Sequence, residues 1–331
     1  MSEFRQDIVS GDWAIIAPGR AKRPDQLVGK KPVRKVAPKK TCPFEFGNLY
    51  ASGQWPPIFP GIITAKTEII VMPNKYPALA LAHADACAQD GMYGLYHTKT
   101  GVGEHELVIT RDHTKTFADL TSRTAGDVFE IFQERHRALR KDPCIAYIST
   151  FFNWGSWAGA SVWHPHYQIL GIPIVPPHIK HSLKGSEAYF KEHRRCVRCD
   201  VIKFELKEKK RIVGKNKHAI AFVPFASKHP FEMSIFPLKH VPSFGHTPAP
   251  VVRGVAQLLQ KVLGGLKRNL HDPDYNVFVH SAPLNYQKYP HHHWHVEILP
   301  KTTISAGFEF ATDININVVA PEDAAKILRR R

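Results

Sequence analysis

Two long stretches of the chain repeat hydrophobic residues at intervals of three and four. They occupy residues 124–139 and 251–266. On an α-helix this spacing brings the apolar side chains onto one face, so both stretches are predicted to be amphipathic helices that pack against a core. Shorter apolar segments with alternating polar positions lie before and after each stretch, and these are typical of β-strands.

The same order of segments occurs in both halves of the chain. The matched segments, first half against second, are 67–80 with 218–236, 106–121 with 232–248, 124–139 with 251–266, and 162–173 with 292–300. Each half predicts several strands, one long helix and a final strand that carries two histidines. We therefore expect an α+β fold with two tandem units in residues 1–185 and 186–331, each an antiparallel sheet with a packed long helix.

The last residues predict one more helix. Pro321 is followed by two acidic residues, and the chain ends in three arginines. Proline in the first turn, acids near the start and bases near the end are the usual order of residues in a helix.

The charge of the chain points to an anionic partner. The 331 residues contain 45 Lys and Arg against 29 Asp and Glu, which gives a formal net charge of +16 and a pI near 9.6. Nucleic acid and nucleotides both fit this charge. The aromatic and glycine patterns of RNA-binding modules are missing, so nucleotides and phosphorylated compounds are favoured and no nucleic-acid partner is expected.

The segregation of hydrophobic residues favours a water-soluble protein. No apolar run approaches the roughly 18 residues that span a bilayer, and the N-terminus lacks the apolar core of a signal peptide. We therefore expect a cytoplasmic protein with no membrane partner. Cys196 and Cys199 form a Cys-x-x-Cys pair that favours a metal in a reducing compartment, whereas Cys87 and Cys144 are expected to be ordinary unpaired thiols.

Cysteine and histidine residues lie at corresponding places in the two halves. The second half offers Cys196, Cys199, His240 and His293, and the first half offers Cys42, His113 and His164, with Glu45 three residues after Cys42. Zinc prefers four tetrahedral ligands drawn from thiolate and imidazole, and a carboxylate is a harder alternative. Two zinc ions per chain are predicted, both structural, because four protein ligands leave no position for a reactive water. For each residue alone, the alternative interpretation is that Cys42 packs in a hydrophobic core and that His113 caps a loop, without a metal.

The segment from Ser161 to Gln168 combines residues suited to covalent catalysis. His164, His166 and Gln168 alternate on a strand and face one way, with a proline between the imidazoles. A neutral His166 imidazole can attack a phosphorus atom, and the Gln168 amide can donate to the phosphoryl oxygen. Ser161 and the backbone at Gly159 are further donors. In the competing interpretation, His164 and His166 are both metal ligands.

Phosphate recognition must use groups other than the common loops. Neither Gly-x-x-x-x-Gly-Lys-Ser/Thr nor Gly-x-Gly-x-x-Gly occurs in the chain. Arg20 and Arg23 are candidates, because a guanidinium group binds phosphate through two parallel hydrogen bonds. A solvated basic loop is the alternative interpretation of this segment.

These residues resemble the galactose-1-phosphate uridylyltransferase family of the histidine-triad superfamily, nearly from end to end. The matching motifs are SGDWAIIAPGRAKRP, CPFE, MPNKYPAL, RDHTKTFADL, FNWGSWAGASVWHPHYQ, CVRC, HHHWHVEILP, AGFEF and PEDAAKILR. The resemblance implies two histidine-triad-like units, a homodimer, and active sites to which the neighbouring subunit contributes.

The resemblance also implies roles for individual residues. His166 would carry the nucleotide and Gln168 would bind its phosphoryl group. Asn153, Gly159 and Ser161 would surround the nucleotide phosphates, Arg20, Arg23 and Asn74 would contact the nucleotide, and Phe308 and Glu309 would lie in the sugar-phosphate region.

Two departures from the family pattern bear on the first zinc site and on the substrate. Glu45 replaces a cysteine that many members carry, and the stretch 303–309 lacks the lysine and the tyrosine that usually grip the hexose phosphate. The lost tyrosine weakens the expectation of galactose specificity, and a related branch with the AGFE ending transfers adenylyl groups from ADP-glucose to phosphate.

The sequence therefore favours a nucleotidyltransferase that exchanges UMP between UDP-glucose and a hexose 1-phosphate such as galactose 1-phosphate. The alternative hypothesis is an ADP-glucose phosphorylase, which transfers the adenylyl group of ADP-glucose to phosphate. A nucleotide hydrolase, an inert nucleotide-binding protein and a zinc-stabilised nucleic-acid-binding protein are more distant alternatives.

Overall fold

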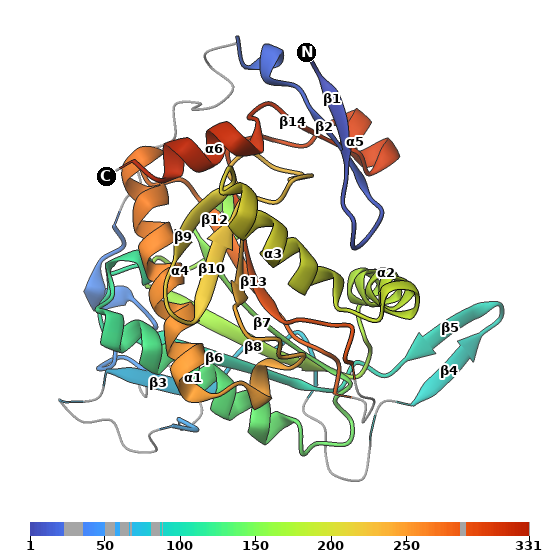
Figure 1. Cartoon of the computed structure of the whole chain (residues 1–331). Helices are drawn as coiled ribbons and strands as arrows, with labels where there is room; N and C mark the ends of the chain where they lie inside the picture. Colours follow the sequence, from blue (N-terminus) through green and yellow to red (C-terminus); the bar gives the residue numbers. More distant parts are fainter. Residues whose placement is uncertain are drawn as a thin grey trace.

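A nine-stranded antiparallel sheet runs through the whole protein (Figure 1). The computed structural model describes residues 1–22, 36–49, 57–59, 66, 68–80, 87, 89–284 and 289–330. In spatial order the strands are β3 (Ile69–Pro73), β6 (Glu104–Thr110), β8 (His166–Ile172), β7 (Tyr147–Trp154), β12 (Tyr275–His280), β13 (His295–Pro300), β11 (Met233–Pro237), β10 (Ala219–Phe222) and β9 (Ile212–Lys215). Strands from both halves of the chain thus share one hydrogen-bonded layer.

The strand order is symmetric about the pairing of β7 with β12. Outward from this pair, β8, β6 and β3 on one side correspond to β13, β11 and β10 on the other. Phe151 of β7 lies opposite Phe278 of β12, at the centre of this pseudo-twofold arrangement. The predicted α+β class with two similar tandem units is confirmed. The boundary after residue 185 stays a prediction, and it falls within α2 (Pro177–His193).

The structure differs from the sequence prediction in one detail of each unit. Two strands follow each long helix instead of one, because β7 and β12 lie between the helix and the histidine strand. The segment of β7 reads YISTFFNW, a mainly apolar run that the repeat comparison did not distinguish from a connection. Without these strands the two units would have no shared edge.

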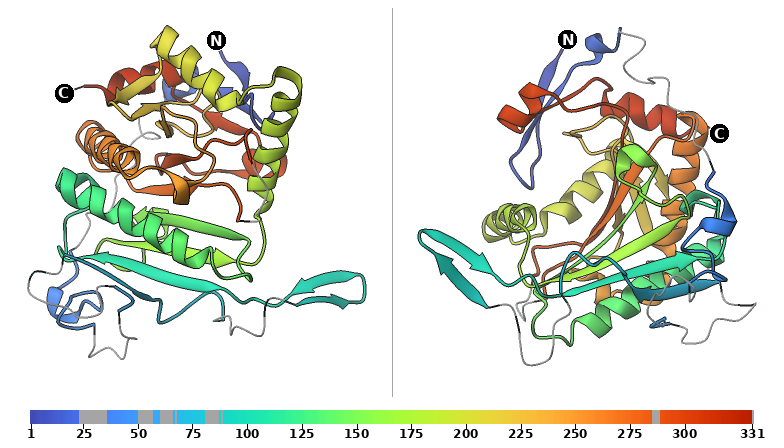
Figure 2. Two further views of the ribbon diagram at one scale, coloured as in Figure 1. Left: turned by 60° about the horizontal axis from the view of Figure 1, so that its bottom comes forward. Right: turned by 180° about the vertical axis from the view of Figure 1, so that it is seen from behind.

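Two long helices lie side by side on one face of the sheet (Figures 1 and 2). They are α1 (Ser122–Leu139) and α4 (Ala249–Asn269), the two predicted amphipathic helices. Phe129 of α1 and Leu259 of α4 are fully buried and belong to the main hydrophobic core. Ala219 and Ala221 of β10 point into the same core.

The opposite face of the sheet is covered by a different segment in each half of the chain. In the second half, Ile220 and Phe222 of β10 pack with Ile202 of α3 (Val197–Glu208). In the first half, Ile70 of β3 packs with the segment 42–49. The two segments that carry the predicted metal-binding cysteines therefore cover equivalent parts of the sheet, because alternate residues of a strand serve opposite faces.

Smaller elements surround this frame. They are β1 (Glu3–Gln6), β2 (Trp13–Ile16), β14 (Asn315–Asn317), the protruding hairpin β4 (Asp90–Tyr93) and β5 (Tyr96–Lys99), the helices α5 (Gly307–Thr312) and α6 (Pro321–Leu328), and the 3-10 turns η1 (Pro18–Lys22), η3 (Lys39–Thr41), η4 (Phe117–Asp119), η5 (Ser156–Ala158) and η6 (Phe244–His246). Helix α6 confirms the predicted C-terminal helix. Strands β1, β2 and β14 form a separate small sheet.

The prediction that Cys87 and Cys144 are unpaired is wrong. They form a disulfide with a Cα–Cα distance of 4.9 Å across a sequence separation of 57 residues. Such a pairing depends on how the chain returns on itself, which cysteine spacing alone does not reveal.

Within the part of the chain that the structure describes, every helix is too short or too polar to cross a bilayer.

Candidate active site and metal centres

His166 begins β8 on the sheet face that the segment 42–49 covers. Tyr167 and Ile169 point the other way, into the core beneath α1. The ring of Phe44 packs edge-on against the His166 imidazole, with 4.9 Å between the ring centres. The alternation of β8 therefore presents His166 and Gln168 on the same face, as the sequence predicted.

The hydrogen bonding of His166 determines which of its nitrogens is free. Nδ1 lies 2.9 Å from the carbonyl oxygen of His164, so Nδ1 carries the proton and donates it. Burial lowers the pKa of the imidazole, against the opposing effect of this hydrogen bond. The ring is therefore neutral, with its lone pair on Nε2.

Four predicted metal ligands of the first half converge beside this strand. Glu45 Oε1 lies 2.9 Å from His113 Nδ1 and 3.8 Å from His164 Nδ1, and Cys42 Sγ lies 3.7 Å from His164 Nδ1. The Glu45 and His113 atoms are buried and close, yet they lack the geometry of a hydrogen bond. Atoms placed in this way face a common point between them.

Backbone carbonyls hold both imidazoles of this group. His113 Nε2 donates to Ala37 at 2.7 Å, and His164 Nε2 donates to Thr110 at 2.6 Å. Each ring therefore turns an unprotonated Nδ1 towards the shared centre. A carbonyl acceptor on the far nitrogen is the usual partner of a metal-binding histidine.

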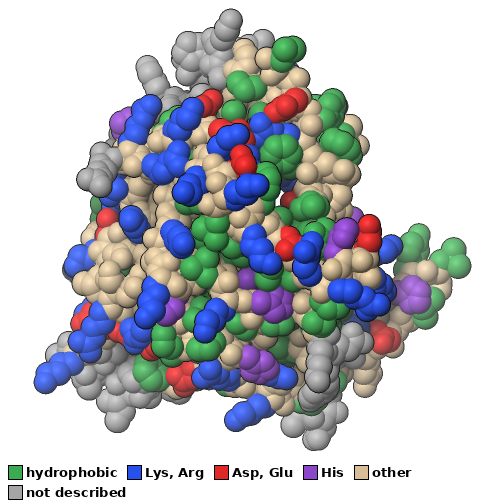
Figure 3. Space-filling view, in the orientation of Figure 1, with side chains coloured by type: hydrophobic (Ala, Val, Ile, Leu, Met, Phe, Trp, Pro, Cys, Tyr) green, Lys and Arg blue, Asp and Glu red, His purple; other side chains and the backbone are tan. Residues whose placement is uncertain are grey.

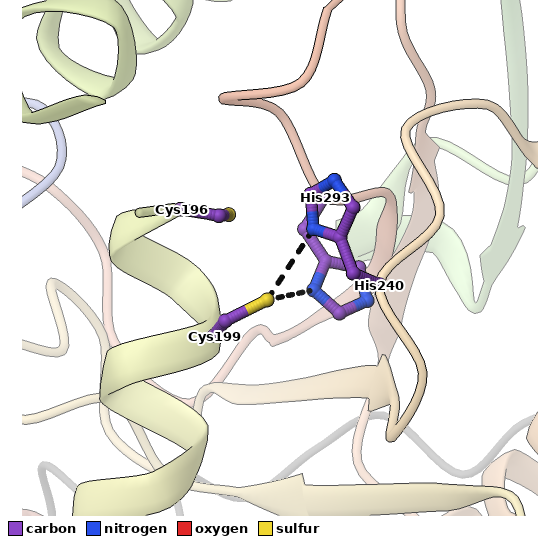
Figure 4. A group of neighbouring side chains, drawn as sticks. All are labelled: Cys196, Cys199, His240 and His293. Atoms are coloured by element: carbon purple, nitrogen blue, oxygen red, sulfur yellow. Dashed lines mark hydrogen bonds between the residues drawn. The ribbon is translucent and has the colours of Figure 1, made fainter. Parts of the chain in front are cut away.

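The second group lies at the equivalent place in the other half (Figure 4). Cys199 Sγ lies 3.3 Å from His240 Nδ1 and 3.6 Å from His293 Nδ1, and Cys196 completes the set at the start of α3. A hydrogen bond from Cys199 lowers the pKa of the Cys196 thiol to about 4, which favours the thiolate. All four ligand atoms lie within 4.8 Å of one another.

Both groups fit a tetrahedral zinc ion. Bonds of about 2.0 to 2.3 Å around a tetrahedral zinc separate neighbouring ligand atoms by roughly 3.3 to 3.8 Å. The distances between thiolates and imidazoles in both groups agree with this separation. In the first group Cys42, His113 and His164 lie within 4.8 Å of one another, and the Glu45 carboxylate lies next to both histidines, where a second cysteine was not available.

A glycine-containing turn follows β7 and leads to the histidine strand. Gly155 and Gly159 have φ values of +84° and +85°, which ordinary side chains rarely adopt. The Asp274 carboxylate accepts the backbone N–H of Trp157 at 2.8 Å and closes the turn from the other half of the chain. A Cβ atom on Gly155 would lie only 2.2 Å from Asp274 Cγ.

The three residues predicted to surround the nucleotide phosphates lie along β7 and this turn. A Cβ atom built on Gly159 would lie 3.9 Å from Asn153 Nδ2, so the amide nitrogen is next to the turn. Asn153 Oδ1 accepts a hydrogen bond from Asn276 at 2.7 Å. Ser161 is exposed just before the His164–His166 segment.

Gln168 connects to Asn74 through a residue that sequence reasoning missed. His105 Nε2 lies 3.0 Å from Gln168 Oε1, and Asn74 Nδ2 lies alongside the His105 ring, 3.1 Å from Nε2. His105 sits on β6, diagonally across from Gln168 on the neighbouring strand. Only the strand register reveals this contact.

The remaining predicted nucleotide residues lie elsewhere on the chain. Arg20 is exposed on η1 directly after β2, and Phe308 and Glu309 are on α5, which leads into β14 beside β2. These elements form a group at the upper end of Figure 1, away from the start of β8. Arg23 lies outside the described residues.

Sequence reasoning also missed a third cluster of ionisable residues. His280, His295 and Glu297 lie on β12 and β13, and His280 Nε2 lies 2.7 Å from Glu297 Oε2. His295 and Glu297 occupy the positions of His166 and Gln168 in the second half. The repeat placed His295 opposite His166, and extending that match by two residues would have found Glu297.

Known proteins are similar to this chain over most of its length. A family described as "Domain of unknown function (DUF4921)" matches residues 78–330. An ADP-glucose phosphorylase of Arabidopsis thaliana is 32% identical over 99% of this chain and 92% of its own length. A galactose-1-phosphate uridylyltransferase of Thermotoga maritima is 28% identical over 99% of this chain and 98% of its own length.

Two solved structures share the fold over nearly their whole length. The Arabidopsis thaliana ADP-glucose phosphorylase with bound ADP-glucose matches with a TM-score of 0.82 and 30% identity, covering 100% of this chain and 99% of that one. A uridylyltransferase matches with a TM-score of 0.75 and 25% identity, covering 99% and 98%.

The turn at Gly155 gives a first prediction. Replacing Gly155 by alanine forces a Cβ atom into the Asp274 carboxylate at a positive φ, so the free energy of unfolding should fall by about 1 to 3 kcal/mol. Urea unfolding measures this loss. Gly19→Ala is the matched control, because no atom lies within 4 Å of the added Cβ there. Equal stability of the two variants would contradict the account of the turn.

Proposed function

We propose that His166 is the nucleophile of this chain, which belongs to the DUF4921 family. The chain also belongs to the nucleotidyltransferase family that contains galactose-1-phosphate uridylyltransferases and ADP-glucose phosphorylases. The observation that carries this proposal is the His166 imidazole, which is neutral, donates through Nδ1 and keeps its lone pair on Nε2. An imidazole in this state can attack phosphorus without first losing a proton.

The proposed reaction is a double displacement. Nε2 of His166 attacks the α-phosphorus of a nucleotide sugar, and the bond from that phosphorus to the bridging oxygen breaks. The sugar 1-phosphate leaves with the bridging oxygen, and the nucleotide stays on His166 as a phosphoramidate. A phosphate oxygen of the acceptor then attacks the same phosphorus, forms the new anhydride bond and releases the imidazole.

Amide donors next to His166 suit the charge that develops in both steps. Gln168 lies two residues along the same strand, and Asn153 lies on the neighbouring strand next to the glycine turn. Neutral amides that donate to the non-bridging oxygens stabilise the transition state without repelling the anionic substrate.

For the substrate pair we propose ADP-glucose as donor and inorganic phosphate as acceptor, which gives ADP and glucose 1-phosphate. This differs from the sequence analysis, which favoured UDP-glucose with a hexose 1-phosphate. Two observations support the change. The ADP-glucose phosphorylase of Arabidopsis thaliana is 32% identical, against 28% for the Thermotoga maritima uridylyltransferase. The stretch 303–309 also lacks the lysine and tyrosine expected for a hexose phosphate.

UDP-glucose exchange with galactose 1-phosphate remains the second candidate. Its support is that the uridylyltransferase match extends over 99% of this chain. Both candidates share the nucleophile and the intermediate, so they differ only in the base and in the acceptor.

We also propose that the two Cys- and His-containing groups hold one zinc ion each. When bound, zinc would tie the segment 42–49 and helix α3 to the sheet, as a structural ion with four protein ligands. In the first group this would fix His164, whose carbonyl oxygen accepts the Nδ1 proton of His166.

The separation of the predicted substrate residues supports a homodimer. Asn74, Asn153 and Gln168 gather around the His166 strand, whereas Arg20, Phe308 and Glu309 belong to the group at β2, β14 and α5. Phe308, Phe310 and Ile304 of that region are exposed, with 44%, 80% and 79% of their surface accessible. We propose that this group of one subunit completes the active site of the other.

Nucleic-acid binding has less support than nucleotide binding. On the face in Figure 3, the Lys and Arg side chains among the described residues are spread between hydrophobic and acidic ones. A nucleic-acid-binding surface usually concentrates its basic residues along one path.

Intact-protein mass tests the nucleophile and the base together. The protein is incubated briefly with ADP-glucose or with UDP-glucose, without acceptor, and quenched at alkaline pH. We expect one adenylyl group per chain from ADP-glucose. The His166→Gly variant should form no adduct, and its turnover rate should fall on the order of 10⁴-fold or more, while its fold and metal content persist.

The control for that experiment is His181→Gln, which changes an exposed histidine on α2 and should form the adduct normally. Uridylyl addition from UDP-glucose alone would support the second candidate. Turnover retained in His166→Gly would exclude His166 as the nucleophile.

Metal analysis tests the zinc proposal. We expect close to two zinc ions per chain, and close to one in Cys199→Ser, because three ligands hold the ion less tightly than four. Cys87→Ser removes one sulfur outside both groups and should leave the zinc content unchanged. A Cys199→Ser protein that keeps both ions would overturn the ligand assignment.

Complementation between two inactive variants tests the shared active site. His166→Gly and a double variant Arg20→Ala, Glu309→Ala should each be inactive alone, and co-expression should restore up to about a quarter of wild-type activity. Half of the dimers would be mixed, and each would carry one intact site. Failure to complement in dimers shown to be mixed would contradict a site shared between subunits.

A further inference from the structure

Two amide side chains at the proposed site share an unusual arrangement. Gln168 and Asn153 are both expected to donate through their NH₂ groups to phosphate, and in each the carbonyl oxygen already accepts a hydrogen bond from a neighbouring side chain. The neighbours, His105 and Asn276, are buried, with 8% and 7% of their surface accessible. Neither was among the residues predicted from the sequence.

The orientation of Gln168 can be traced back to the backbone. The Asn74 NH₂ group lies beside both His105 nitrogens, 3.4 Å from Nδ1 and 3.1 Å from Nε2, so it does not distinguish them. The N–H of Ala78 lies 3.2 Å from Nδ1 and can only donate, so Nδ1 is the unprotonated nitrogen. His105 Nε2 therefore carries the proton and donates to Gln168 at 3.0 Å. The atom of Gln168 that faces His105 must then be its oxygen, and the NH₂ group lies on the other side.

The orientation of Asn153 is anchored in the same way. The carbonyl oxygen of Ala158 lies 2.7 Å from the amide of Asn276 and can only accept, so this end of Asn276 must be its NH₂ group. The same NH₂ group lies 2.7 Å from Asn153 and donates to it. Asn153 must therefore accept through Oδ1, which leaves Nδ2 beside Gly159.

We propose that His105 and Asn276 are positioning residues that hold the amides of Gln168 and Asn153 with their NH₂ groups towards the transferring phosphoryl group. This inference rests on the proposed function. The two ends of a carboxamide are nearly equal in shape, so packing alone does not distinguish them. With the orientation reversed, the amide oxygen would face the anionic phosphoryl oxygens and repel them.

The second positioning residue comes from the other half of the chain. Asn153 and Asn276 are directly paired across β7 and β12, the central strands of the sheet. The C-terminal half thus contributes to the phosphate site of the N-terminal half, although it does not contain the nucleophile. The pairing of the two units would then be a requirement of catalysis as well as of stability.

Replacement of His105 tests the first arm. In His105→Leu the donor to Gln168 is lost, and we expect the single-turnover rate of nucleotidyl-His166 formation to fall on the order of tenfold to a hundredfold. His105→Gln keeps an NH₂ group near the position of Nε2 and should recover most of that rate. His136→Gln is the matched control, because His136 is an equally buried histidine whose Nε2 bonds to Thr150 Oγ1 on the opposite, α1-covered side of the sheet.

A double-mutant cycle separates positioning from general damage. Gln168→Ala should lower the rate by itself, and adding His105→Leu to it should cause little further loss, because the amide to be oriented is gone. Independent effects that multiply would overturn the role of His105, even if each single variant were slow.

Asn276→Asp tests the second arm with almost no change in shape. The aspartate can no longer donate to Asn153, so we expect the rate of nucleotidyl transfer to fall at least tenfold, with a smaller change in KM. Gln133→Glu is the matched control, since Gln133 is a buried amide on α1 whose NH₂ group donates to the carbonyl oxygens of Phe244 and Thr247 outside the site. It should lose stability and keep its rate.

The outcomes distinguish this inference from the proposed function. If the wild-type protein forms no adduct with either nucleotide sugar, the proposed function is wrong and the inference falls with it. If the wild-type adduct forms and folded Asn276→Asp and His105→Leu react at wild-type rates, the positioning role is wrong and the nucleophile stands. Thermal unfolding and zinc content of each variant show whether it is folded.

Discussion

The pairing of β7 with β12 is the interaction on which the rest of the structure depends. It joins a four-stranded unit and a similar five-stranded unit edge to edge and removes an exposed strand edge from each of them. It also brings α1 and α4 together on one face, where both bury their apolar sides in a single core. At the end of the same pair, Asn276 and Asp274 reach across to Asn153 and to the glycine turn.

The two halves keep a common frame and differ in the chemistry of their equivalent sites. By strand register, Gln168 corresponds to Glu297 and His105 corresponds to Glu232. A carboxylate in place of the Gln168 amide repels phosphate, and Glu297 is instead bound to His280. Burial and the charge of Glu297 raise the pKa of Glu232 to about 8. These replacements assign the proposed transfer chemistry to the first half alone, with the second half as support.

Local spacing and internal repetition explain what the sequence could predict. In the Cys-x-x-Cys turn, in the His-Pro-His segment and in each of the two long helices, the residues that define the pattern are only a few positions apart. Their relative geometry therefore follows from helix and strand periodicity. The repeat then related His113 to His240. The structure brings Glu45 close to His113 and His164, and the ligand set that this comparison suggested stays a proposal.

Local sequence patterns could not reveal contacts that depend on strand register or on which distant segments the fold brings together. His105 meets Gln168, 63 positions away in the sequence, across two neighbouring strands, and Asn276 meets Asn153 across the pairing of the two units. The disulfide of Cys87 and Cys144 has the same origin. The separation of Arg20, Phe308 and Glu309 from His166 was likewise invisible, because sequence motifs carry no information about which group lies on which side of the molecule.

The central claim is that the nucleotide passes through the enzyme as a covalent intermediate. Isotope exchange tests it most directly: labelled glucose 1-phosphate is mixed with unlabelled ADP-glucose and the protein, with no inorganic phosphate present. A double displacement predicts that the label enters ADP-glucose, because the first half-reaction is reversible by itself. A protein that turns over ADP-glucose with phosphate but leaves the label in glucose 1-phosphate would contradict the intermediate on His166.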